Sequence, residues 1–167
     1  MGKYRIKKGL YLPITGSPKQ EISKTIRTKK VAILGDDYVG MKPTMLVSIG
    51  DEVKLVQVLF TDKKTPGVKY TSPASGMISQ INRGDKRVFK SIVIDTNGSG
   101  EEQFKSYSES ELENLASNDV RENLIESGLW TSIRVRPFSN VADPSTSPNS
   151  IFRPATDTTP LAPSIKN

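Results

Sequence analysis

The sequence predicts a mainly β domain, a barrel or a sandwich, followed by two short helices and an extended proline-rich segment. Residues 31–95 contain short apolar runs with a turn about every 8–12 residues, a spacing typical of all-β barrels and sandwiches. From Ser108 the pattern changes to residues that begin and end helices. Six of the eleven prolines lie from Pro137 onward, so this tail does not form a compact core alone. It is either disordered or the first part of a further domain.

Turn residues separate the expected strands. Gly50 and Asp51 form a pair that favours a positive φ angle, and the pair Gly84-Asp85 recurs at a second turn as a faint internal repeat. Between these turns, residues 77–81 (MISQI) alternate apolar and polar side chains, as a half-buried strand does. The strands are expected at residues 31–34, 44–49, 56–60, 68–73, 77–81 and 87–94.

Two helices are expected after the strands. Ser108 and Glu111 form a capping box at the start of the first helix. Ser117 or Asn118 is expected to cap the second helix, and Gly128 suits the position after its end, where a left-handed conformation is needed. One face of the second helix carries the apolar side chains that we expect to pack on the β domain: Val120, Leu124 and Ile125.

The composition excludes several classes of site. The chain has no Cys and no His, so it offers no disulfide, no thiolate or imidazole metal ligand and no Ser-His-Asp triad. It contains neither a G-x-G-x-x-G nor a Walker A sequence, which argues against a nucleotide site of its own. It has no signal-peptide pattern and no apolar run near the ~18 residues of a membrane span. We therefore expect it on the cytoplasmic side.

The net charge of +6 is unevenly distributed. Residues 1–30 hold nine basic residues and one acid, a net of +8, whereas residues 101–128 hold eight acids and two bases, a net of −6. A basic segment attracts a membrane surface, a nucleic acid or an acidic protein, unless it is simply solvated. A nucleic-acid-binding β module is disfavoured, because single-strand binders interleave aromatic with basic residues and this segment offers only Tyr4 and Tyr11.

The middle of the β region resembles a biotinyl or lipoyl carrier domain. Gly50-Asp51-Glu52-Val53, Asp62-Lys63 and Pro73-Ala74-Ser75-Gly76 stand where that family has its motifs, which would make Lys63 or Lys64 the modified residue. However, the segment from Lys63 to Pro73 is longer than a lipoyl hairpin and contains Pro66-Gly67. Because modifying enzymes read the geometry of the tip, we expect an unmodified scaffold.

A closer resemblance covers residues 6–162. The chain resembles the N-terminal part of the A subunit of the sodium-translocating NADH:quinone reductase, the NqrA family. The resemblance lies in six stretches in the same order: IKKGLYLPITGSP, GDDYVGMKPTM, VQVLFTDKKTPGVKYTSPASG, INRGDKRV, ESGLWTSIRVRPFS and IFRPATDTTPLA. The C subunit of the Rnf electron-transport complex shares the same β start and is the alternative.

The resemblance implies an architecture. It predicts a barrel-sandwich hybrid β domain at residues 1–103, beginning with the basic segment 1–30. A helical connector at 104–130 follows, and residues 131–167 are expected to be the extended start of an incomplete α/β, Rossmann-like domain.

The resemblance also implies a role. The chain is expected to be a peripheral subunit of a six-subunit translocase, which passes electrons from NADH to ubiquinone and exports Na⁺. It is not expected to be a free-standing enzyme or to bind a cofactor or metal of its own, and ubiquinone is the substrate of the complex. The expected partners are the membrane-embedded B subunit and the other subunits, with the membrane surface also available and no nucleic acid. The expected location is the cytoplasmic face of the bacterial inner membrane.

Two segments are implied to lie near the quinone, Leu34–Met41 and Ile133–Asn140. From the residues themselves, Tyr38 could line a slot for a flat ring or pack in the core, and Arg134 and Arg136 could grip an anion or face solvent. Asp36 and Asp37 could bind a metal, but adjacent carboxylates after a strand usually just end it. The quinone-proximal residues implied by the resemblance are Leu34, Gly35, Tyr38, Val39, Gly40, Met41, Ile133, Arg134, Arg136 and Phe138.

Overall fold

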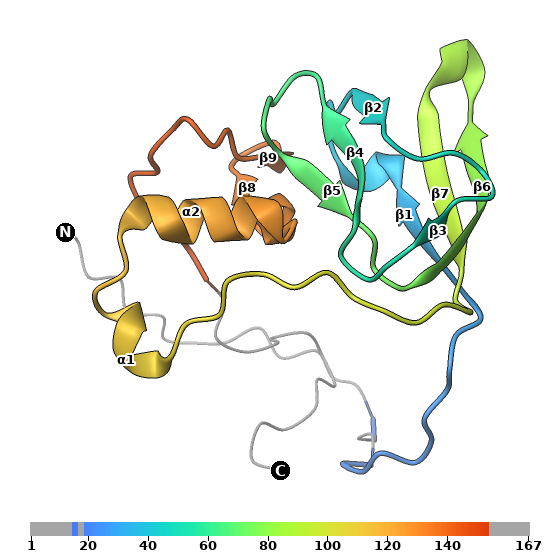
Figure 1. The fold of residues 1–167 in the computed structure, drawn as a ribbon, viewed down its shortest axis with the longest axis horizontal. Coiled ribbons are helices and arrows are strands. Elements are labelled where there is room, and N and C mark those ends of the chain that lie inside the picture. Colours follow the sequence, from blue (N-terminus) through green and yellow to red (C-terminus); the bar gives the residue numbers. More distant parts are fainter. Residues whose placement is uncertain (1–14, 17–18, 154–167) are drawn as a thin grey trace. The chain divides into compact units, whose positions relative to one another are not determined.

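The structure of the chain is a computed structural model that describes residues 15–16 and 19–153 (Figure 1). Much of the basic segment 1–30 and the end of the 131–167 segment lie outside the described residues. Residues 27–147 form one compact unit, and the described residues outside it, 15–16, 19–26 and 148–153, belong to a second unit. Every helix and strand described belongs to the first unit.

Two antiparallel sheets build the β part of this unit, as the sequence predicts. The first sheet has the strand order β1-β7-β6-β3 and the second has the order β2-β4-β5. Its strands are β1 (Lys30–Leu34), β7 (Phe89–Asp95), β6 (Gly76–Arg83) and β3 (Glu52–Val53). Those of the second are β2 (Pro43–Met45), β4 (Val58–Asp62) and β5 (Lys69–Thr71). A separate ladder pairs β8 (Arg134–Val135) with β9 (Asn140–Val141), two strands that the sequence pattern did not indicate.

The predicted turns join these strands. Gly50 adopts the expected positive φ of 95°, between β2 and β3. At the β6–β7 turn, by contrast, Gly84 has a φ of −95°, and the positive φ angles fall on Lys86 and Arg87. Residues 77–81 lie in β6 as a strand, but the predicted alternation is wrong beyond Ile78. Ile78 is fully buried, whereas Met77 and Gln80 are both exposed, because the register with β7 shifts between Ile78 and Gln80.

The core takes its buried side chains from both sheets. Burying an apolar side chain of this size contributes roughly 1.5–3 kcal/mol, so this cluster is the main source of stability. Its fully buried members are Leu59, Phe60, Val68, Ile78, Ile92 and Ile94.

A row of aromatic rings runs through this core. Phe60 on β4 stacks on Tyr70 of β5, with ring centroids 4.6 Å apart, and meets Phe89 of β7 edge-on at 5.3 Å. Tyr70 in turn meets Tyr38 edge-on at 4.8 Å. The Tyr70 hydroxyl is buried and has no hydrogen-bond partner among the described residues. Burial, followed by the charge of Asp62, raises the pKa of this hydroxyl well above its usual value, so it stays protonated.

Two helices follow the sheets, α1 (Glu109–Leu112) and α2 (Ser117–Glu126). The predicted capping box of α1 is confirmed, since Glu111 accepts from both the backbone N–H and the hydroxyl of Ser108. The predicted cap of α2 is wrong, because Ala116 holds the capping position and makes no side-chain hydrogen bond there.

A short 3₁₀ helix, η3 (Leu129–Ser132), fastens the helices to the second sheet. It begins after Gly128, which has the predicted left-handed conformation, with φ of 77°. Gly128 lies so close to β5 that a Cβ there would come within 2.2 Å of the Thr71 hydroxyl oxygen. Trp130 of η3 is buried and donates from Nε1 to the carbonyl of Ala142 at 2.8 Å. Leu124 and Ile125 of α2 pack on the core as predicted, whereas Val120 is exposed.

The unpaired Tyr70 hydroxyl gives the first prediction. Tyr70→Phe removes a buried polar group that satisfies no partner, so the free energy of unfolding should stay constant or increase. Tyr70→Ala should lower it by about 3–5 kcal/mol, because it also removes the ring from the aromatic row. Urea unfolding of the two variants measures both effects. A loss above ~1 kcal/mol in Tyr70→Phe would mean that the hydroxyl makes a hydrogen bond after all.

Candidate functional site

The segment after β1 forms one wall of a cavity. β1 ends at Leu34 and the chain turns through η1 (Gly35–Asp37). Gly35 lies against β7, where a Cβ would come within 2.3 Å of the Phe89 carbonyl oxygen, so only glycine fits at this approach. Gly40 has a φ of 75° and turns the chain toward β2. The wall is thus shaped by its two glycines.

The turn between β6 and β7 forms the opposite wall. The cavity has a volume of about 660 Å³. Its lining combines an apolar surface with basic side chains from both walls. The apolar and aromatic residues that line it are Tyr38, Val39, Met41, Pro43, Val88 and Phe89. The charged ones are Asp36, Lys42, Arg83, Lys86 and Arg87.

The β6–β7 turn holds two basic residues in an unfavourable conformation. Within η2 (Asp85–Arg87), Lys86 has φ 53° and ψ 26° and Arg87 has φ 62°, while Val88 N–H donates to the Asp85 carbonyl at 3.1 Å. These are the features of a type I′ turn, whose central positions favour Asn-Gly. A left-handed conformation costs a residue other than glycine roughly 1–2 kcal/mol. The turn therefore keeps Lys86 and Arg87 at a cost in stability.

The basic side chains of the cavity lack acidic partners. Asp36 is the one acid in the lining, and it pairs with Lys90 at 3.2 Å. No carboxylate among the described residues lies within ion-pair distance of Lys42, Arg83, Lys86 or Arg87. The described residues also contain no cluster of three or more potential metal-ligating residues. The charge of the lining therefore suits an anion better than a cation.

Sequence reasoning missed this basic wall. The pattern NRGDKR at residues 82–87 indicated only a turn. A signal was present, because Lys-Arg stands in the centre of a tight hairpin turn where Asn-Gly is usual. That this turn lines a cavity could not be predicted, because the other wall contains Tyr38 and Val39, which are more than forty positions away in the sequence.

Arg134 connects the two segments that the resemblance singled out. Its guanidinium donates to the Asp37 carbonyl at 3.1 Å and to the Ser139 carbonyl at 3.3 Å. The same group lies over the ring of Tyr38, 4.9 Å from the centroid, in cation–π geometry. Residues about a hundred positions apart are therefore brought into direct contact. Tyr38 also packs against the core, so its ring contacts Tyr70 as well as the Arg134 guanidinium.

The remaining predicted residues are more dispersed. Gly35, Val39, Gly40 and Met41 line the cavity with Tyr38. Ile133 packs against the core instead. Three others are exposed and line neither cavity: Leu34, Arg136 and Phe138. β8 ends at Val135, so Arg136 lies outside the strand and does not share the environment of Arg134.

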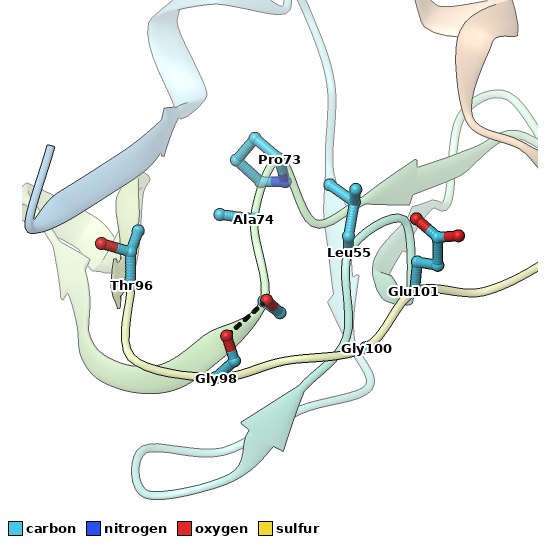
Figure 2. Close-up of a pocket in the computed structure, with 8 residues that line it drawn as sticks. Leu55, Pro73, Ala74, Thr96, Gly98, Gly100 and Glu101 are labelled. Carbon is cyan, nitrogen blue, oxygen red and sulfur yellow. Dashed lines mark hydrogen bonds between the residues drawn. The ribbon is translucent and has the colours of Figure 1, made fainter. Parts of the chain in front are cut away.

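A second cavity lies at the Pro73–Gly76 turn, with a volume of about 670 Å³ (Figure 2). Leu55 and Glu101 line it from two neighbouring stretches of chain, which are joined by the Leu55–Glu101 bridge. Ser75 donates from its hydroxyl to the Gly98 carbonyl at 2.9 Å, which holds the turn against residues 96–100 (Figure 2). Glu101 is the only charged side chain in its lining, so this cavity lacks a group that would attract an anion.

The tip between β4 and β5 carries Lys63 and Lys64. Asp62, buried at the end of β4, accepts hydrogen bonds from the backbone N–H groups of Lys42 at 2.9 Å and Lys64 at 3.0 Å. Lys63 N–H donates to the Lys42 carbonyl at 2.9 Å. The backbone at the base of the tip is therefore fixed to the segment before β2, while both lysine side chains are exposed.

Comparison with protein families agrees with this architecture. Residues 4–97 match a family model described as the NqrA N-terminal barrel-sandwich hybrid domain. The chain belongs to the NqrA family. Residues 115–167 match a model described as the NqrA second alpha/beta domain, which agrees with the predicted start of an α/β domain. Both matches favour the NqrA family over the Rnf alternative.

Similar curated proteins are named as the A subunit of the Na(+)-translocating NADH-quinone reductase. The protein from Pseudomonas aeruginosa is 54% identical over 158 residues, which cover 95% of this chain and 36% of that protein. The protein from Marinomonas sp. (strain MWYL1) is 56% identical over 161 residues, covering 96% of this chain and 36% of that protein. The protein from Vibrio anguillarum is 52% identical over 157 residues, covering 94% and 35%. The chain thus spans about a third of the length of these NqrA-family proteins.

The hairpin tip gives the second prediction. Lys63 and Lys64 should carry no lipoyl or biotinyl group, because the segment from Lys63 to Pro73 is longer than a lipoyl hairpin and contains Pro66-Gly67, which changes the tip that a modifying enzyme reads. Intact mass spectrometry of the protein purified from its native host should give the unmodified mass. An added lipoyl or biotinyl mass that disappears in Lys63→Arg or Lys64→Arg would show the prediction to be wrong.

Proposed function

We propose that this chain forms the N-terminal part of the A subunit of a sodium-translocating NADH:ubiquinone reductase. The observation that carries the proposal is identity of 52–56% over at least 94% of the chain to proteins with that name. The activity belongs to the whole complex, which moves electrons from NADH to ubiquinone and exports Na⁺. This chain acts in it as a peripheral subunit.

The chain contributes no redox centre of its own. Its lack of Cys and His removes the usual protein ligands of iron–sulfur clusters and haems, although such groups could be held by other subunits. The basic lining of the cavity does not suit a metal cation either. A structural or substrate-guiding role fits these residues better than catalysis.

The proposed location is the cytoplasmic face of the membrane, on the membrane-embedded B subunit. None of the helices in the described part of the chain is both long and apolar enough to cross a bilayer. The basic residues of segment 1–30 offer attraction to acidic lipids or to acidic surfaces of partner subunits. The chain is therefore proposed to be attached through other subunits and surface charges.

The proposed quinone-proximal region consists of residues 34–41 and 133–140. The Arg134 contacts with Asp37 and Tyr38 support this proposal, because they join the two segments. Leu34 and Phe138 leave exposed apolar surface on the two segments, which a lipophilic ring or tail could cover. A neighbouring subunit would complete the enclosure, since apolar sites for small molecules bury most of the ligand surface.

Purification of the complex tests the assignment. A tag on the chain in its native host should co-purify membrane redox subunits from detergent-solubilised membranes, together with Na⁺-stimulated NADH:quinone reductase activity. A tagged cytoplasmic protein of similar size and charge serves as the control. Recovery of the chain without any membrane redox subunit would contradict the proposal.

A double variant tests the quinone role. Leu34→Thr with Phe138→Ala removes exposed apolar surface, so the fold should be unaffected. In the assembled complex the KM for ubiquinone should rise about tenfold, since lost aromatic and apolar contacts are worth roughly 1–2 kcal/mol. Leu112→Thr with Phe152→Ala is the matched control, because both residues are exposed and lie outside the two segments. An equal KM in both double variants would remove these residues from the quinone site.

A further inference from the structure

The cavity beside the β6–β7 turn shares one wall, residues 35–41, with the proposed quinone-proximal region, but its basic side chains are not explained by that role. Four basic side chains line it, Lys42, Arg83, Lys86 and Arg87, and none has an acidic partner among the described residues. Neighbouring cations repel one another, so an unpaired group of them is stabilised when an anion binds. Arg side chains are well suited to phosphate, which they bind through two parallel hydrogen bonds.

The same cavity offers apolar surface directly beside the charges. Val39 on one wall and Val88 on the other each expose 52% of their surface, and both line the cavity. A small hydrophilic anion would leave this surface uncovered. An amphiphilic anion, with a phosphate and an adjoining hydrocarbon part, would satisfy the cations and cover both valines.

The shape of the turn points in the same direction. β6 and β7 form a long hairpin whose turn lies at the end of the first sheet, beyond the core strands (Figure 1). At this end the chain uses Lys86 and Arg87 in the left-handed conformation that Asn-Gly would adopt with less strain. Strained residues of this kind are concentrated at functional sites. A tight turn alone does not require Lys86 and Arg87, so their positive charges indicate a function in binding.

Charge is also separated along the compact unit. The acidic excess lies in residues 101–128, which contain α1 and α2, whereas the unpaired cations lie at the β6–β7 turn and the segment before β2. A charge dipole of this kind orients a protein on an extended anionic surface. An isolated phosphate metabolite would not need it.

We propose that this cavity binds the phosphate group of an anionic phospholipid at the membrane surface. Lys42, Arg83, Lys86 and Arg87 hold the phosphate, and Val39 and Val88 contact the first part of the acyl chains. This proposal rests on the proposed function in one respect, which is that the protein lies close to a lipid bilayer. Contact of this wall with lipid would also bring residues 34–41 to the surface from which a lipophilic quinone arrives.

The test uses a variant that removes the charges and keeps the turn. Lys86→Asn with Arg87→Gly installs the pair that a type I′ turn favours, so the thermal midpoint should be equal to or above that of the wild type. The matched control is Lys54→Gln with Lys105→Gln, which removes two exposed positive charges that do not line the cavity. Lys54 loses only an exposed ion pair with Glu102, which contributes little.

Sedimentation with vesicles gives the readout. The full chain should bind vesicles of phosphatidylcholine with phosphatidylglycerol more tightly than vesicles of phosphatidylcholine alone, and 1 M salt should abolish the difference. The Asn-Gly variant should bind the anionic vesicles roughly 30-fold more weakly, since each basic residue near such a surface is worth about 1 kcal/mol. The control should retain clearly more of the binding than the Asn-Gly variant.

Several results would overturn the proposal. Equal losses in the Asn-Gly variant and the control would indicate only non-specific attraction. Binding without preference for phosphatidylglycerol would exclude recognition of the anionic headgroup. Glycerol 3-phosphate or an acidic peptide binding to the cavity as tightly as vesicles would assign it to a soluble phosphate or a protein partner instead. Because the assay contains neither quinone nor partner subunits, its failure leaves the proposed function to be tested separately by co-purification.

Discussion

The stacking of Phe60 on Tyr70 lies at the centre of a row of rings that connects the two sheets with the segment after β1. Phe60 also meets Phe89 of the first sheet, and Tyr70 meets Tyr38 in the segment after β1. The guanidinium group of Arg134, which is about a hundred positions later in the sequence, lies over the ring of Tyr38. One row of rings therefore joins the two sheets with the segment after β1, and through Arg134 with the β8–β9 ladder, and it fixes the position of Tyr38 in the candidate site.

In this arrangement, the aromatic side chains of the row pack in or against the core, and a different set of side chains is available to bind other molecules. Tyr70 is buried in the core, and its hydroxyl stays protonated there with no hydrogen-bond partner among the described residues, while Tyr38 packs against the core from the cavity wall. The side chains left for contact with other molecules lie around the row, at the basic wall of the cavity and at exposed apolar positions such as Phe138. Such a division agrees with the proposed role, in which the chain offers surfaces to lipid, quinone or partner subunits.

Much of the fold could be predicted because its signals are local. The pair Gly50-Asp51, the capping box at Ser108 and the left-handed Gly128 each depend on neighbours within a few positions. The cap of α2 was mispredicted because Ser117 and Asn118 are both good capping residues, yet the helix begins one residue earlier, after Ala116. Short strands such as β8 and β9 leave no periodic pattern, because two residues are too few to alternate visibly.

The sequence by itself determined the mainly β class, the absence of His and Cys side chains, the order of the longer strands and the helices, and the family resemblance. All of these follow from composition, local pattern and motif order. The tertiary structure alone decided which of the candidate residues meet. In the structure, Arg134 lies over the ring of Tyr38 and Ile133 packs against the core. Lys86 and Arg87 line the same cavity as Val39. The physical reason is that contacts between distant segments depend on sheet packing and hairpin direction, which sum over many weak interactions and leave no mark at any one position of the sequence.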